Sequence, residues 1–234
     1  MKLFGQPDYY DRSESFRRAE KFRSRGRIKK AIREYEKVLA VDPTDLEVHA
    51  KIAPLYIRAG RKIQAKASLK RVSAWHEKEG FVEKAIAMLR LALTLDRRDL
   101  AVSLNLANLY LGKDLEADAL RLLEGARRTF RRKRFLREAI AVEEKILSFA
   151  ADNFRAQVSL VRLFWKAGRR RDARERLWQM ESQWARRKNR RCWRKTRWLL
   201  CRRAPSLSTC WGYFISLFIS PVPYRPEKRH HFAS

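Results

Sequence analysis

The chain has 234 residues, of which 55 are lysine or arginine and 26 are aspartate or glutamate, so its formal net charge is +29. This excess favours acidic partners such as nucleic acid, anionic lipid headgroups and acidic proteins. Only eight glycines are present, the composition favours helix almost throughout, and the spacing of Cys192, Cys201 and Cys210 matches no zinc site.

The first predicted elements are a leader over residues 1–11 and two helices. Asp11 or Ser13 is a suitable N-cap for a helix that runs to about residue 24. Gly26 interrupts it, and a second helix over about 28–41 ends at Pro43, because proline cannot continue a helix and restricts the residue before it.

Further helices follow at regular intervals. Thr44 or Asp45 opens a helix over about 46–59, and Gly60 ends it in the left-handed conformation. Residues 61–79 contain no helix breaker and predict one long helix that serves two hairpins, with Ile63, Ala67, Val72 and Trp75 as its apolar positions. The remaining helices are expected at about 81–95, 99–111, 115–132, 135–149, 153–167 and 169–187.

An alanine opens the apolar stripe of six of these helices. The six are Ala31, Ala65, Ala85, Ala119, Ala139 and Ala173, and the gaps between them alternate between 34 and 20 residues, so the pattern closes every 54 residues. Three such 54-residue repeats and the N-terminal helix predict about ten helices. Alanine lets two helices cross closely, and stacked neighbours bury the stripe that one hairpin leaves open.

The 34-residue spacing resembles that of the tetratricopeptide repeat. The residues that carry the resemblance are Ala19, Phe22, Gly26, Ala31, Tyr35 and Pro43 in one copy, Leu106, Ala107, Tyr110, Ala119 and Ala126 in another, and Leu160, Phe164, Gly168 and Ala173 in the last. The tryptophan of that family is replaced by Ser15, His49, Ser103 or Gln157. The resemblance implies an all-α, right-handed superhelical solenoid of antiparallel hairpins over residues 12–188.

The resemblance also implies a concave groove, lined by the first helix of each hairpin, that binds a peptide segment of a partner. The positions that correspond to it are Lys51, Arg58, Asn105, Asn108, Arg155, Ser159, Arg162 and Lys166. Asparagine bonds a peptide backbone and arginine binds carboxylates, so an acidic segment is expected. The two-carboxylate clamp of the family is not reproduced, and a merely solvated face is the competing interpretation. The function expected is that of a non-catalytic scaffold or adaptor.

A basic run gives the alternative function, binding of nucleic acid or of an anionic membrane. It comprises Arg127, Arg128, Arg131, Arg132, Lys133 and Arg134, at the expected end of a long helix. Phe130 and Trp184 lie between arginines, where an aromatic ring can stack on unpaired bases. A solvated basic edge is the simpler explanation, since helix C-termini favour cations, and no known nucleic-acid module is visible.

Nothing in the sequence indicates catalysis. Nucleotide-binding glycine loops and zinc-protease motifs are absent, so no enzyme activity, cofactor, metal or small-molecule substrate is expected. His49 and His76 are interpreted as packing residues. Glu143 and Glu144 are adjacent on a helix and do not face each other, so they are interpreted as solvated surface.

The repeat pattern is lost in residues 189–234. The alanine expected near position 193 is Trp193, acidic residues nearly vanish, and we interpret this basic stretch with tryptophan and cysteine as an irregular tail, disordered or produced by a shift of reading frame. Residues 204–224 are uncharged, which gives membrane attachment as an alternative, although Pro205 and Pro221 argue against a spanning helix. Since the N-terminus lacks the apolar run of a secretion signal, a cytoplasmic location is expected.

Overall fold

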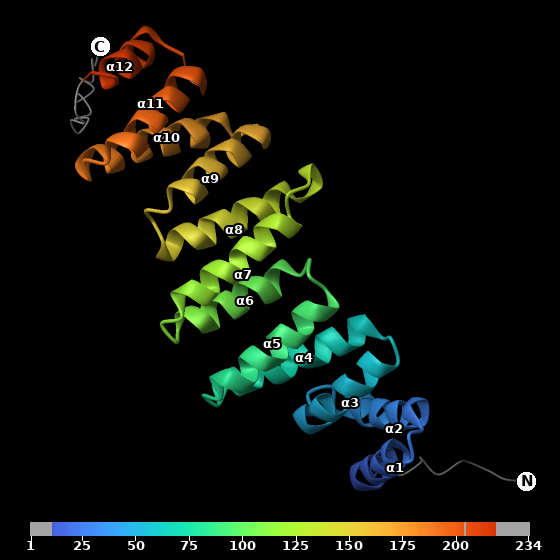
Figure 1. The fold of residues 1–234 in the computed structure, drawn as a ribbon. Helices are drawn as coiled ribbons and strands as arrows, with labels where there is room; N and C mark the ends of the chain where they lie inside the picture. The colour runs from blue at the N-terminus through green and yellow to red at the C-terminus, as the bar shows by residue number, and fades with distance from the viewer. Residues whose placement is uncertain (1–10, 204, 219–234) are drawn as a thin grey trace, which may run out of the picture. The chain divides into compact units, whose positions relative to one another are not determined.

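The computed structural model describes residues 11–203 and 205–218, which form α-helices joined by short turns (Figure 1). The expected leader lies outside the described residues except for Asp11, and so do residues 204 and 219–224 of the uncharged stretch. The chain divides into two compact units between Thr129 and Phe130. We call them unit 1 and unit 2.

Unit 1 contains seven helices in the part of the chain that the structure describes. They are α1 (Arg12–Ser24), α2 (Ile28–Val41), α3 (Leu46–Arg58), α4 (Lys62–Lys78), α5 (Val82–Leu95), α6 (Leu100–Leu111) and α7 (Glu116–Thr129). Each helix packs on the next along the chain, and α4 packs on both α3 and α5. The prediction of one long helix that serves two hairpins is therefore confirmed.

The predicted apolar positions of α4 are mostly wrong. Ile63 is 80 % exposed and Trp75 is 37 % exposed, whereas Val72 is buried. The face that is buried consists of Ala65, Ser68, Leu69, Val72 and Ser73. Its small serines let the helices approach closely enough for the Ser73 hydroxyl to donate to the Ala85 carbonyl oxygen of α5 at 3.2 Å. A search for large apolar residues misses such a stripe.

The same N-cap hydrogen bond recurs every 54 residues at the start of a helix. The side chain of Asp45 accepts a hydrogen bond from the Val48 N–H, and Asp99 and Asn153 cap α6 and α9 (Phe154–Lys166) in the same way. Each cap satisfies a backbone donor that has no partner inside its own helix. At the other end of α3, Gly60 has the predicted left-handed conformation with φ of 75°.

Unit 2 contains a short 3-10 helix and five α-helices within its described residues. They are η1 (Lys133–Phe135), α8 (Leu136–Phe149), α9, α10 (Arg170–Arg186), α11 (Arg190–Arg203) and α12 (Leu207–Ser216). Here too each α-helix packs on the next. Both units therefore show the stacked hairpins of a helical-repeat solenoid (Figure 1).

The expectation of an irregular tail is wrong for residues 190–203 and 207–216, which form α11 and α12. Trp193, Thr196, Leu199 and Leu200 form the buried face of α11. Thr196 supplies a small residue there, although the alanine expected near 193 is absent. The two helices raise the number found in the described residues to twelve, against the ten expected. The limits of the repeat domain at 12 and 188, and a shifted reading frame, stay predictions.

The alanine pattern on which the fold was predicted is confirmed. Ala31, Ala65, Ala85, Ala119 and Ala173 are fully buried, and Ala139 is only 7 % exposed. Each lies near the start of a helix, and that helix packs on a neighbouring helix of the same unit. The close helix crossings that alanine permits thus occur throughout both units.

Candidate functional site

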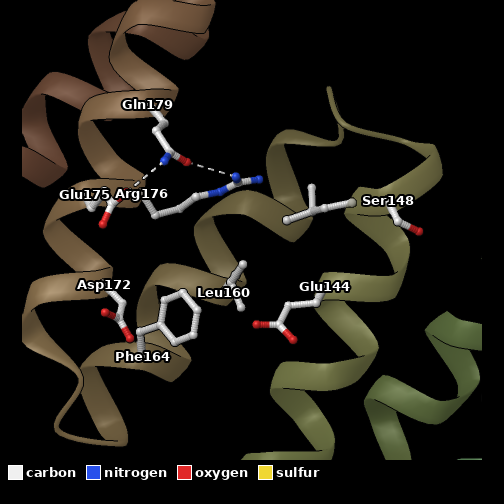
Figure 2. A pocket seen from close by; sticks show the side chains of 9 residues that line it. Glu144, Ser148, Leu160, Phe164, Asp172, Glu175, Arg176 and Gln179 are labelled. Carbon is white, nitrogen blue, oxygen red and sulfur yellow. Dashed lines mark hydrogen bonds between the residues drawn. The ribbon is translucent and has the colours of Figure 1, made fainter.

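Unit 2 has a pocket of about 400 Å³ between α8, α9 and α10, which we call the acidic pocket (Figure 2). Its apolar floor consists of Leu147, Leu160 and Phe164. The polar side chains around it are Glu144, Ser148, Asp172, Glu175, Arg176 and Gln179. Glu144 projects from α8 toward α10, and Leu160 and Phe164 of α9 lie between these two helices (Figure 2).

The charges of the acidic pocket are only partly compensated. The Gln179 side chain accepts a hydrogen bond from Arg176 at 3.2 Å and donates one to Glu175 at 3.4 Å, so it separates these two charges (Figure 2). Asp172 pairs with Arg169 outside the pocket. Burial lowers the pKa of Arg176, whose Nε has no hydrogen-bond partner among the described residues. Three carboxylates therefore face one guanidinium.

Unit 1 has a larger pocket of about 810 Å³ between α5, α6 and α7, which we call the basic pocket. Its apolar lining includes Leu93, Leu106, Tyr110 and Leu122, and its charged lining is Arg90, Arg97, Asp118 and Arg121. Asp118 lies 3.5 Å from Arg121 on the same helix, where both side chains are largely exposed. Three guanidinium groups thus face one carboxylate.

The two pockets are the same feature of the 54-residue repeat. Every residue that lines the acidic pocket has its counterpart 54 positions earlier in the lining of the basic pocket. The floor keeps its residue types, with Leu160 corresponding to Leu106 and Phe164 to Tyr110. The rim does not, since Glu144 corresponds to Arg90 and Glu175 to Arg121. The repeat therefore builds one cavity twice, with opposite charge.

Comparison with known proteins agrees with this architecture. Residues 22–81, which span α2, α3 and α4, match the family model described as tetratricopeptide repeat. Residues 22–81 are therefore similar to tetratricopeptide repeats. Such repeats generally act as non-catalytic scaffolds for interaction between proteins. No curated protein matches the sequence.

Several solved structures resemble the chain at low identity. A MamA protein is 21 % identical, with 70 % of this chain and 87 % of that one covered and a TM-score of 0.26. YrrB, described as a TPR protein with an unusual peptide-binding site, is 13 % identical over 67 % and 86 %, with a TM-score of 0.32. PilF of Pseudomonas aeruginosa is 16 % identical over 87 % and 96 %, with a TM-score of 0.33. At these values the resemblances carry no functional conclusion.

The residues predicted to line a concave groove of the tetratricopeptide repeats do not line either pocket. Asn105 and Asn108 are exposed on α6, while Leu106 and Tyr110 of the same helix line the basic pocket. On α9, Arg155, Arg162 and Lys166 are exposed. Lys51 and Ser159 are half-buried, and Arg58 is exposed. Their role in binding a peptide stays a prediction.

One predicted groove residue has a definite internal partner. The Ser159 hydroxyl donates a hydrogen bond of 2.6 Å to the Glu143 carboxylate, and Glu143 is only 1 % exposed. The interpretation of Glu143 as solvated surface is therefore wrong. By contrast, the packing role predicted for His49 is confirmed, because its ring lies 3.1 Å from the Ser68 hydroxyl and 3.0 Å from the Pro43 carbonyl oxygen.

The predicted basic run lies on both sides of the boundary between the units. Arg127 and Arg128 belong to α7 of unit 1, whereas residues 131–134 belong to unit 2 and are exposed. Phe130 is 1 % exposed and Trp184 is 5 % exposed. The expectation that these two rings stack on unpaired bases is therefore wrong, since both are part of the core.

A third pocket, of about 640 Å³, lies between α11 and α12, and we call it the tail pocket. It is lined by Arg190, Arg191, Arg194, Lys195, Trp198 and Tyr213. Trp198 is 41 % exposed. This site was not predicted from the sequence, because residues 189–234 were expected to be irregular. If residues 190–203 are drawn as a helix, these cations lie on one side of it, and this spacing is the sequence signal that could have indicated the site.

No cluster of potential metal ligands and no helix with the length and apolarity of a membrane span occurs in residues 11–203 and 205–218. The expected absence of a metal and the alternative of membrane attachment through 204–224 stay predictions.

Proposed function

We propose that the chain is a non-catalytic scaffold that binds an acidic segment of another protein in the basic pocket of unit 1. The observation that supports this is the combination of an apolar floor with Arg90, Arg97 and Arg121 in one cavity. Leu106, which is 1 % exposed, and Tyr110 supply the floor. An apolar side chain on the floor and flanking carboxylates on the arginines together satisfy both parts of the pocket.

The concave groove predicted from the sequence is a second surface that could bind an acidic segment. Asn105 and Asn108 are exposed on α6, and amide side chains can bond the backbone of an extended peptide. Binding at this face does not need the arginines of the basic pocket. Variants of the two surfaces therefore distinguish them.

The double variant Arg90→Glu and Arg121→Glu is expected to lower the affinity for an acidic peptide at least tenfold, because it turns two attractive contacts into repulsive ones. The probe is a labelled peptide with one leucine flanked by glutamates, and binding is measured by fluorescence anisotropy. Arg17→Glu with Arg33→Glu is the control, since these exposed arginines of unit 1 lie on α1 and α2 and give the same change in net charge. Equal losses in both double variants would refute binding in the pocket.

A second candidate function, binding of single-stranded nucleic acid, is favoured by the tail pocket. Four cations surround Trp198 and Tyr213 there, and exposed aromatic rings beside cations bind unpaired bases and phosphates together. Neutralised phosphates give such binding a steep dependence on salt. Salt also weakens the ion pairs of an acidic peptide in the basic pocket, but the contact with the apolar floor remains, so the dependence on salt is less steep. A salt titration therefore separates the two functions.

Trp198→Ala is expected to weaken binding of a single-stranded oligonucleotide by about 1–3 kcal/mol, the contribution of one stacked base. Arg194→Glu with Lys195→Glu is expected to reduce the salt dependence as well. Both are measured by anisotropy between low and physiological salt. Trp75→Ala serves as the control, because this tryptophan of unit 1 is similarly exposed. An unchanged affinity in Trp198→Ala would exclude stacking in the tail pocket.

A further inference from the structure

The acidic pocket has a charge opposite to that of the chain as a whole. Glu144, Asp172 and Glu175 face Arg176 in a chain whose net charge is +29. Glu144 and Glu175 correspond to arginines in unit 1, and Asp172 corresponds to an aspartate, while the floor of both pockets is leucine with one aromatic ring. The reversal of charge is therefore confined to the side chains that would meet the charged groups of a ligand.

Two of the carboxylates are available to a cation that enters the pocket. Glu144 is exposed and forms no ion pair with any residue that the structure describes. Glu175 accepts one weak hydrogen bond from the Gln179 amide. Glu144 belongs to α8 and Glu175 to α10, so the two carboxylates come from opposite walls (Figure 2). A cation between them is attracted from both sides.

Arg169, which does not line the pocket, shows how a guanidinium binds to two residues that do. Its guanidinium carbon lies 4.4 Å from the centre of the Phe164 ring, and its Nε pairs with Asp172. The contact combines a cation over an aromatic face with a charged hydrogen bond. Phe164 and Asp172 both line the pocket. These two lining residues thus already bind one arginine of the chain itself.

The floor suits the stem of a basic side chain. Lysine and arginine carry three or four methylene groups that cover apolar surface while the charged end stays at a polar rim. Leu160 and Phe164 supply the apolar surface, and Glu144 and Glu175 lie at the rim. A cavity of about 400 Å³ is within the size range of ligand sites in proteins.

We propose that the acidic pocket binds a lysine or arginine side chain, with an apolar neighbour, in a segment of a partner protein. This inference rests on the proposed scaffold function, but it concerns another pocket and a ligand of the opposite charge. One chain would then hold an acidic segment in unit 1 and a basic segment in unit 2.

The net charge of the protein makes a cationic peptide a selective probe. A chain of +29 repels such a peptide over most of its surface, so any binding reports a local site of opposite charge. We choose a labelled peptide with one central arginine flanked by leucines, and the same peptide with citrulline in place of arginine. The citrulline peptide keeps the shape and loses the charge.

The full-length chain is expected to bind the arginine peptide at least tenfold more tightly than the citrulline peptide in fluorescence anisotropy. Glu144→Arg with Glu175→Arg, which copies the residues of unit 1 into unit 2, is expected to abolish this difference. Glu144→Gln with Glu175→Gln is expected to reduce it without introducing repulsion. Both pairs lie on exposed positions, so circular dichroism should show an unchanged helix content.

The control changes exposed carboxylates elsewhere. Glu77→Arg with Glu79→Arg alters the net charge equally at the end of α4 in unit 1, and it should leave the arginine peptide bound. Equal affinity for the arginine and citrulline peptides, or an effect of the control equal to that of the pocket variant, would overturn the inference. The acidic peptide tests unit 1 separately, so failure of the scaffold proposal and failure of this inference give different results.

Discussion

Replacing Arg197 with alanine is expected to lower the free energy of unfolding of unit 2 by about 3 kcal/mol, because a buried carboxylate then loses its cation. Glu181 of α10 is 1 % exposed and lies 3.0 Å from Nη2 and 3.1 Å from Nε of Arg197 in α11. The same guanidinium donates to the Gly212 carbonyl oxygen of α12 at 2.6 Å. One side chain therefore connects the last three helices of unit 2.

Urea unfolding of the full chain, followed by tryptophan fluorescence, measures this effect. Six of the seven tryptophans lie after residue 129, so the signal reports unit 2. Arg191→Ala is the control on the same helix, since Arg191 is exposed. Adding Glu181→Gln to Arg197→Ala is expected to recover at least half of the loss, because glutamine still accepts the hydrogen bond from Trp193 and leaves no buried charge.

The same experiment tests whether the tail is part of the fold. An equal urea midpoint for Arg197→Ala and Arg191→Ala would contradict the packing of α11 on α10. It would also restore the interpretation of residues 189–234 as a segment without a structural role.

Replacing Ala85 with leucine is expected to lower the free energy of unfolding of unit 1 by about 2–3 kcal/mol, because extra methylene groups in a close helix crossing force the helices apart. Ala85 is fully buried. Its carbonyl oxygen receives the hydrogen bond of 3.2 Å from Ser73 of α4, which a separation of the two helices would break.

Ala87→Leu is the matched control for this change. Ala87 lies two residues further along α5 and is exposed, so it receives the same substitution in the same helix without a crowded neighbour. Thermal unfolding followed by circular dichroism should show a clear loss for Ala85→Leu and little change for Ala87→Leu. Similar unfolding temperatures for the two variants would contradict the role given to the repeated alanines.

The repeat architecture was predictable because its signals are local and occur several times. Ala31, Ala85 and the other stripe alanines set the period, and Pro43 and Gly60 mark helix ends whose backbone requirements are specific to those residues. The start of α3 at Asp45 follows from the same local chemistry. These features need no knowledge of which helices meet.

The fold of the tail was not predicted, because the small residue of α11 is threonine and lies three positions after the expected alanine. Thr196 is fully buried, and Trp193, Thr196 and Leu200 have the spacing of one helix face. The carboxylate that holds α11 is that of Glu181, and its sequence neighbours do not indicate that it is buried. Its partners Trp193 and Arg197 become apparent only when the two helices are placed together.

The pockets were not predictable from periodicity for a different reason. A cavity forms where side chains of three neighbouring helices are too short or too tilted to fill the space between them. Glu144 of α8 and Glu175 of α10 are 31 positions apart, and nothing local indicates that they face one cavity. What the sequence does contain is the 54-residue period, which relates them to Arg90 and Arg121 once one pocket is known.

The duplicated cavity has a consequence for how such a chain acquires new partners. The walls that decide stability are leucines and aromatic rings shared by both copies, whereas the rim side chains Glu144 and Arg90 are exposed. Substitutions at exposed positions usually change the free energy of unfolding by less than about 0.5 kcal/mol. Divergence of ligand preference between copies therefore proceeds almost independently of the selection that maintains folding.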